Sequence, residues 1–119
     1  MLRIRFFLPD PENRPALRGE CAGCGVGYAV KRRWMKLFDG DELEGEICPE
    51  CVLAGPAGAA GKVRGRLGAM GRIENETGDE EERTSWVRRM ERRAHLLEET
   101  PSFSLAARQA AVRETRERR

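Results

Sequence analysis

Two cysteine pairs, Cys21-Ala-Gly-Cys24-Gly25 and Cys48-Pro-Glu-Cys51, decide how the N-terminal half of this chain folds. A Cys-x-x-Cys turn aims two thiolates at one ion, and two such turns supply four sulfurs in a tetrahedron. That ligand set is typical of structural zinc, with Zn–S distances near ~2.3 Å. Gly25 lets the chain leave the first turn with a positive φ angle. The pattern therefore predicts one structural zinc ion, held by all the cysteines that the chain contains.

Three other roles for these cysteines are open. Disulfides belong to oxidising compartments, but the apolar run at Leu2–Leu8 is too short for a secretory signal and is interrupted by arginines. An iron site similar to that of rubredoxins would use the same two turns, although Val52 stands where rubredoxins have glycine. A catalytic zinc ion needs an open coordination position, and four thiolates leave none. Structural zinc remains the prediction.

Residues 17–52 resemble the zinc-ribbon superfamily. The two Cys-x-x-Cys turns, the glycine after the first and a β-hairpin expected between them carry the resemblance. It implies a small β domain built around the metal. Zinc ribbons occur in transcription factors, ribosomal proteins, topoisomerases, polymerase subunits and phage proteins, so the resemblance implies no single partner.

Strand patterns flank the first cysteine pair. Apolar residues at positions 2, 4, 6 and 8 alternate with Arg3 and Arg5, which predicts a strand with one buried face. The prolines and polar residues of 9–13 then predict a turn.

A hairpin is expected between the cysteine pairs. Residues 28–38 are predicted to form one strand, and Asp39-Gly40 suits a tight turn. Residues 41–47 are predicted to return antiparallel, with Leu43 and Ile47 on one face.

Residues 54–78 are rich in glycine and admit two interpretations. One is a flexible linker. The other is a glycine-weakened helix over 57–71, because apolar residues recur there at spacings of three and four and Pro56 suits a first helical turn.

Two helices are predicted in residues 79–119. The first runs over 80–99, with Asp79 as a possible cap and acidic residues in its first turn. The second follows the break at 100–102, and either Thr100 or Ser104 can cap it.

Composition limits the possible functions. The 119 residues carry 22 basic and 20 acidic side chains, a net charge of +2, which does not favour strong nonspecific binding to nucleic acid or to anionic membranes. No apolar stretch approaches the roughly 20 residues that span a bilayer. We expect a cytoplasmic protein without a membrane partner and without a small-molecule substrate.

Two groups of residues are candidates for binding macromolecules. Basic residues surround an aromatic side chain on the expected hairpin and could contact phosphates and a base: Lys31, Arg32, Arg33, Trp34 and Lys36. The alternative is that Trp34 packs under the hairpin and the charges are merely solvated. An apolar stripe on the helix over 80–99 could bind a partner protein: Trp86, Val87, Met90 and Leu97. The alternative is an internal helix–helix contact.

The sequence as a whole predicts an α+β protein in three segments. These are a zinc-ribbon domain with an N-terminal strand over 1–53, the linker or weak helix over 54–78, and a helical hairpin over 79–119. His95, the single histidine, has no neighbours in sequence that would suggest catalysis. We therefore expect a non-enzymatic zinc module. It would be an accessory or regulatory protein of nucleic-acid machinery or, alternatively, a protein–protein adaptor without nucleic-acid contact.

Overall fold

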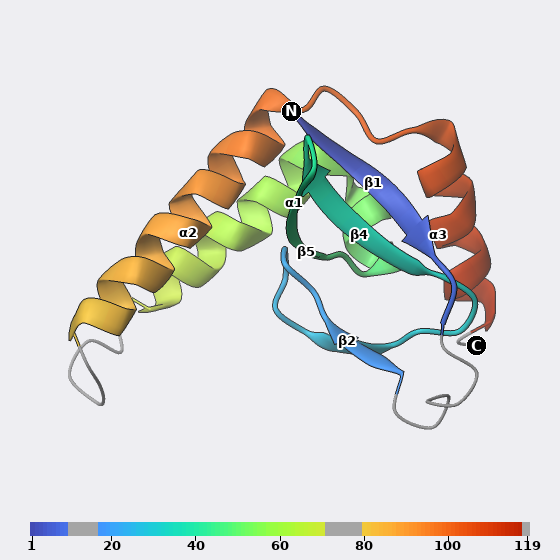
Figure 1. Cartoon of the computed structure of the whole chain (residues 1–119), viewed down its shortest axis with the longest axis horizontal. Coiled ribbons are helices and arrows are strands. Elements are labelled where there is room, and N and C mark those ends of the chain that lie inside the picture. Colours follow the sequence, from blue (N-terminus) through green and yellow to red (C-terminus); the bar gives the residue numbers. More distant parts are fainter. Residues whose placement is uncertain (10–16, 71–79, 118–119) are drawn as a thin grey trace.

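The chain folds into antiparallel strands followed by helices, which confirms the α+β class (Figure 1). The computed structural model describes residues 1–9, 17–70 and 80–117. The strands in these ranges are β1 (Leu2–Phe7), β2 (Arg18–Glu20), β3 (Gly27–Ala29), β4 (Trp34–Asp39) and β5 (Glu42–Glu46). The helices are α1 (Pro49–Met70), α2 (Glu80–Glu99) and α3 (Leu105–Glu117).

The main sheet has the strand order β1-β4-β5, with all neighbours antiparallel. The predicted N-terminal strand is confirmed over Leu2–Phe7. Its register places Ile4 opposite Leu37 and Phe6 opposite Met35, so these side chains share one face. Both β4 residues on that face are buried. Positions 10–13 of the turn expected after this strand lie outside the described residues.

The single strand predicted over 28–38 is wrong, because the chain forms two strands there. β3 pairs with β2 in a separate two-stranded ribbon, whereas β4 pairs with β1 and β5. The break lies at residues 30–33. There the backbone N–H groups of Lys31, Arg32 and Arg33 donate to the Glu114 carboxylate of α3 instead of to a neighbouring strand.

The predicted hairpin is confirmed, but the side chains of its second strand point to different faces than expected. A two-residue turn joins β4 to β5, and Gly40 has a positive φ of 61°, as the first central residue of a type II′ turn does. The register then shifts, since Leu37 pairs with Gly45 and Phe38 with Leu43. This bulge turns Leu43 outward, where it is 56% exposed, while Ile47 is fully buried. The expectation that Leu43 and Ile47 share a face is therefore wrong.

The glycine-rich segment is helical where the structure describes it. α1 is kinked at Gly55, whose φ of 83° and ψ of 170° are not helical, and Pro56 opens the helix again. The helical interpretation of 57–71 is confirmed up to Met70. Side chains from this helix, including Ala59, Ala60 and Val63, are buried.

The two C-terminal helices are confirmed, and both pack on α1. Figure 1 shows α2 running alongside α1, whereas α3 lies at the opposite end of the sheet. Ser104 caps α3, because its Oγ accepts from the Ala107 N–H at 3.1 Å. Thr100 instead ends α2 and accepts the Leu2 N–H at 2.9 Å, which ties the first strand to that helix. The expected cap Asp79 lies outside the described residues.

One apolar core joins the sheet to the helices. Its buried members come from every part of the chain: Leu2, Met35, Leu37, Ile47, Val52, Val63, Met90, Leu97 and Phe103. Small side chains fill the rest of the helical contacts, namely Ala59, Ala60, Ala94, Ala107 and Ala111. Because these side chains are small, the helices can approach closely. The division of the chain into three segments stays a prediction.

Candidate functional site

The four cysteines lie together in a cluster that can hold one metal ion. Their Sγ atoms all lie within 4.8 Å of one another. The Sγ atoms of Cys24 and Cys48 are 3.7 Å apart, and a tetrahedron with Zn–S near ~2.3 Å requires about 3.8 Å between sulfurs. None of the four forms a disulfide. Their side chains therefore fit a tetrahedral metal site.

The first cysteine pair lies on a tight turn that follows β2. The N–H of Gly25 donates to the carbonyl of Cys21 at 2.9 Å, and Gly25 has the predicted positive φ, at 76°. A Cβ added to Gly25 would lie 2.8 Å from the guanidinium carbon of Arg66. The positive φ therefore favours glycine here, and an added Cβ would also displace the Arg66 side chain.

The second cysteine pair lies at the start of a helix, whereas the first lies on a turn that follows a strand. Cys48 directly precedes α1, Pro49 occupies its first position and Cys51 lies in its first turn. The N–H of Val52 donates to the Cys48 carbonyl at 3.1 Å. A proline at the first helical position favours helix, so this pair continues into α1 instead of into a strand.

Hydrogen bonds favour a thiolate at Cys21. The backbone N–H groups of Gly23 and Cys48 each donate to its Sγ at 3.3 Å. Hydrogen bonds from the thiols of Cys48 and then Cys51 hold the pKa of Cys21 far below its usual range. The hydrogen bond to Cys21 raises the pKa of Cys51 to about 12 and also raises that of Cys48. A bound cation must therefore displace protons from the latter two thiols.

Three cationic side chains lie around the cysteine cluster, and no pattern in the sequence predicts their role there. The Lys62 Nζ lies 3.7 Å from the Cys51 Sγ. Arg66 donates to the carbonyls of Ala22 and Gly23. Four thiolates around a divalent ion carry a net negative charge, which these cations offset. Lys62 and Arg66 lie on α1, the helix that also carries Cys51, whereas Arg93 comes from α2.

The third of these cations is Arg93 of α2. It donates to the carbonyls of Ala22 at 3.1 Å and Glu44 at 3.0 Å, which links the first cysteine turn to β5. Burial lowers the pKa of Arg93, although the nearby Glu44 opposes that shift. This half-buried arginine therefore links α2 to the first cysteine turn and to the sheet.

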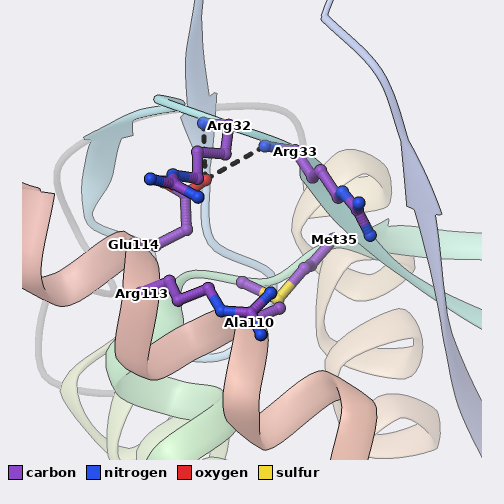
Figure 2. A pocket seen from close by; sticks show the side chains of 6 residues that line it. All are labelled: Arg32, Arg33, Met35, Ala110, Arg113 and Glu114. Atoms are coloured by element: carbon purple, nitrogen blue, oxygen red, sulfur yellow. Dashed lines mark hydrogen bonds between the residues drawn. The ribbon is translucent and has the colours of Figure 1, made fainter.

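The start of the predicted nucleic-acid segment is held by α3. The Glu114 carboxylate, in a residue only 3% exposed, accepts backbone N–H groups from Lys31 at 3.1 Å, Arg32 at 2.6 Å and Arg33 at 3.0 Å. Figure 2 shows this carboxylate beneath the segment, at a cavity of about 120 Å³ that Arg113 also lines. Lys31, Arg32 and Arg33 are all exposed residues. Their backbone is therefore fixed while their side chains reach solvent.

Trp34 and Lys36 lie on β4, on the face opposite the buried residues Met35 and Leu37. Both are half-buried. The Lys36 Nζ lies 5.5 Å from the centre of the Trp34 ring, within cation–π range. One edge of the ring also lies against Gly19 of β2, where an added Cβ would come within 2.8 Å of it. Trp34 thus contributes to packing and to the surface.

The residues predicted to bind a partner protein divide by burial. Met90 is 2% exposed and Leu97 is fully buried, so both lie in the core of the chain. Trp86 and Val87 are half-buried. The internal helix–helix interpretation accounts for Met90 and Leu97, and a partner at this stripe stays a prediction.

Comparison with protein-family models, with curated proteins and with solved structures gives no match for this chain. In the described ranges, no helix combines the length and the apolar character that crossing a bilayer requires.

Proposed function

We propose that this protein is a non-enzymatic zinc module that binds nucleic acid as an accessory or regulatory component of nucleic-acid machinery. The observation that carries the proposal is the fixed basic segment Lys31–Lys36, in which cations surround an aromatic ring. The protein would work in a reducing compartment, where the four thiols stay available to the metal.

Zinc is the proposed metal because the ligands are four sulfurs and the first cysteine turn is built for a thiolate. Tetrahedral thiolate sites suit zinc or iron–sulfur chemistry. Four protein ligands complete the coordination of zinc, so the ion would stabilise the fold without activating water. This is the reason for proposing a structural and not a catalytic centre.

The fixed backbone of the basic segment supports the nucleic-acid role. Binding costs the ordering of flexible side chains and loops, and that cost falls when the backbone is already held. Glu114 supplies this restraint by accepting three N–H groups, and the side chains of Arg32 and Arg33 remain exposed. Cations held in this way are suited to contacting phosphates.

The test is fluorescence anisotropy of labelled DNA and RNA, both single- and double-stranded, across a salt series. Each phosphate contact contributes about −0.7 to −0.9 to the slope of log affinity against log salt. Four cations in this segment predict a total slope of roughly −3. Replacing Arg32 and Arg33 together by Gln should flatten the slope by about two contacts' worth.

A matched double variant controls for net charge. Arg88 of α2 and Arg108 of α3 are exposed arginines that do not belong to this segment, and their replacement by Gln should leave the slope near the wild-type value. An equal loss in both double variants would show that binding follows net charge alone. The absence of saturable binding even at low salt would reject the proposal and favour the protein–protein adaptor.

A further inference from the structure

The outer face of the β1-β4-β5 sheet alternates cations with aromatic rings. The register places side chains from two strands on this face: Arg3, Arg5, Phe7, Trp34, Lys36 and Phe38. We call these six residues the outer sheet face. β1 is far from the basic segment in sequence, so only the strand pairing unites them.

The cations and rings of the outer sheet face touch one another. The guanidinium carbon of Arg5 lies 4.9 Å from the centre of the Phe38 ring. The Lys36 Nζ lies 5.2 Å from the Phe7 ring, and the Phe7 and Phe38 rings are 5.9 Å apart. Phe7 is nevertheless 40% exposed. Phe7 thus presents an exposed ring with positive charges beside it, whereas the Trp34 and Phe38 rings are half-buried.

Two features of the outer sheet face are unfavourable without a ligand. Arg5 and Lys36 are directly opposite each other on neighbouring strands, and like charges in such a position destabilise a sheet. Exposed aromatic rings add unburied apolar area. Glu46, which pairs with Lys36 on β5, is the one acidic residue that the described register places opposite a cation of this face. A polyanion that also offers flat apolar rings would relieve both costs.

Single-stranded nucleic acid has that chemistry. Its phosphates complement the cations, and its unpaired bases can stack on aromatic side chains regardless of sequence. In a duplex the bases are stacked on each other, so a flat sheet can reach the phosphates but not the base faces. An acidic peptide would satisfy the charges and leave the rings exposed.

We infer that the outer sheet face is a stacking platform for single-stranded nucleic acid. This inference rests on the proposed function and names the class of nucleic acid. Phe7 and Phe38 receive bases, while Arg3, Arg5 and Lys36 contact the phosphates between them. Trp34 borders the platform where it packs on Gly19.

The experiment compares three probes with the full chain. These are an oligothymidylate of about ten nucleotides, within the roughly 4–16 that single-strand folds cover, an abasic strand of equal length, and a duplex. The oligothymidylate should bind more tightly than the abasic strand, by at least the roughly 5- to 100-fold that one stacked base contributes. Phe7→Leu should lose about the same factor, whereas Phe7→Tyr keeps a ring and should bind as the wild type does.

Leu105→Ala, at an exposed apolar side chain of α3, is the matched control and should change nothing. Thermal unfolding of each variant shows whether the sheet is intact. If Phe7→Leu does not fold, the comparison of oligothymidylate with the abasic strand on the wild-type chain decides the question alone. Equal binding of all three probes, or of the Leu and Tyr variants, overturns the stacking platform and leaves the proposed function standing. Absence of saturable binding for every probe overturns both.

Discussion

At the scale of single residues, Glu114 decides the conformation of the basic segment. Its carboxylate is buried and accepts three backbone N–H groups from residues 31–33. Successive N–H groups that converge in this way form a concave anion site, and here the anion belongs to the chain itself. The contact joins residues that are more than 80 positions apart.

Glu114→Gln should therefore destabilise the protein. The amide keeps one acceptor oxygen but turns donors toward N–H groups that need acceptors, and hydrogen bonds to a charged group contribute about 1.5–3 kcal/mol each. We expect a loss of roughly 2–3 kcal/mol in the free energy of unfolding, measured by denaturant titration. Glu91→Gln, at an exposed glutamate of α2, should have little effect. Equal stability of the two variants would contradict the role given to Glu114.

At the scale of elements, α1 has a low intrinsic helix propensity although it lies between the other two helices and packs on both. Gly61, Gly65 and Gly68 lie in its second segment, and a Cβ added at any of them would meet no atom within 4 Å. Glycine inside a helix is about 0.8–1.0 kcal/mol less favourable than alanine. The helix is held by its packing against α2 and α3, not by its own propensity.

Gly61→Ala and Gly65→Ala should each stabilise the chain by about 0.4–1 kcal/mol. The gain should appear as a higher unfolding midpoint without a change in metal content. Gly25→Ala provides the contrast, because its φ is positive and Arg66 lies on it, so that variant should lose stability. A loss in the Gly61 variant would show that α1 has neighbours at that position beyond those described.

On the buried face of α2 we expect a substitution to lower the stability of the chain. Leu97 is fully buried, so Leu97→Asp removes apolar contacts and buries a charge without a partner. The expected loss is several kcal/mol, enough to unfold a chain of this size at ambient temperature. Leu105→Asp, the same change at a residue 61% exposed at the start of α3, should be nearly neutral by circular dichroism and thermal unfolding. Similar stability of both variants would show that the core is misplaced.

At the scale of the whole molecule, the metal cluster lies where sheet and helices meet. The first cysteine turn follows β2 and the second begins α1, while Arg66 and Arg93 donate to carbonyls within the first turn. Metal binding free energy in small domains contributes directly to folding. Removal of the ion should therefore loosen residues 17–54 first, and the helices beyond the kink at Gly55 should partly survive.

Metal analysis of the purified chain should find one zinc ion and negligible iron. A chelator should then abolish the dispersion of amide signals from residues 17–54. Metal-bound thiolates hold fewer protons than the unfolded chain, so the metal-bound fold loses stability as the pH falls below about 8, by up to ~1.4 kcal/mol per pH unit and per ligand thiol. An amide spectrum unchanged by the chelator, or a stability that rises with acid, would show that the metal is not structural.

Sequence alone determined the features that depend on spacing along the chain. Four thiols in two Cys-x-x-Cys pairs predict a shared metal site wherever the pairs meet. Apolar residues alternate with polar ones in β1 and recur at helical spacing in α2. Each pattern reflects one buried face, so both elements could be predicted. The positive φ of Gly25 followed from the exit of the first cysteine turn.

Tertiary structure decided the features that depend on contacts between distant residues. Glu114 interrupts the strand expected over 28–38. A hydrogen-bond partner on α3 cannot be predicted from the local sequence of that strand. The bulge between β4 and β5 reverses the facing of Leu43, because one extra residue shifts a period-two pattern. The alanines and glycines of α1 allowed both a linker and a helix, since a helix packed by two others on small side chains shows only a weak apolar periodicity. The outer sheet face exists only because strand pairing brings Arg5 and Phe7 beside Lys36 and Phe38, and pairing register is set by the fold as a whole.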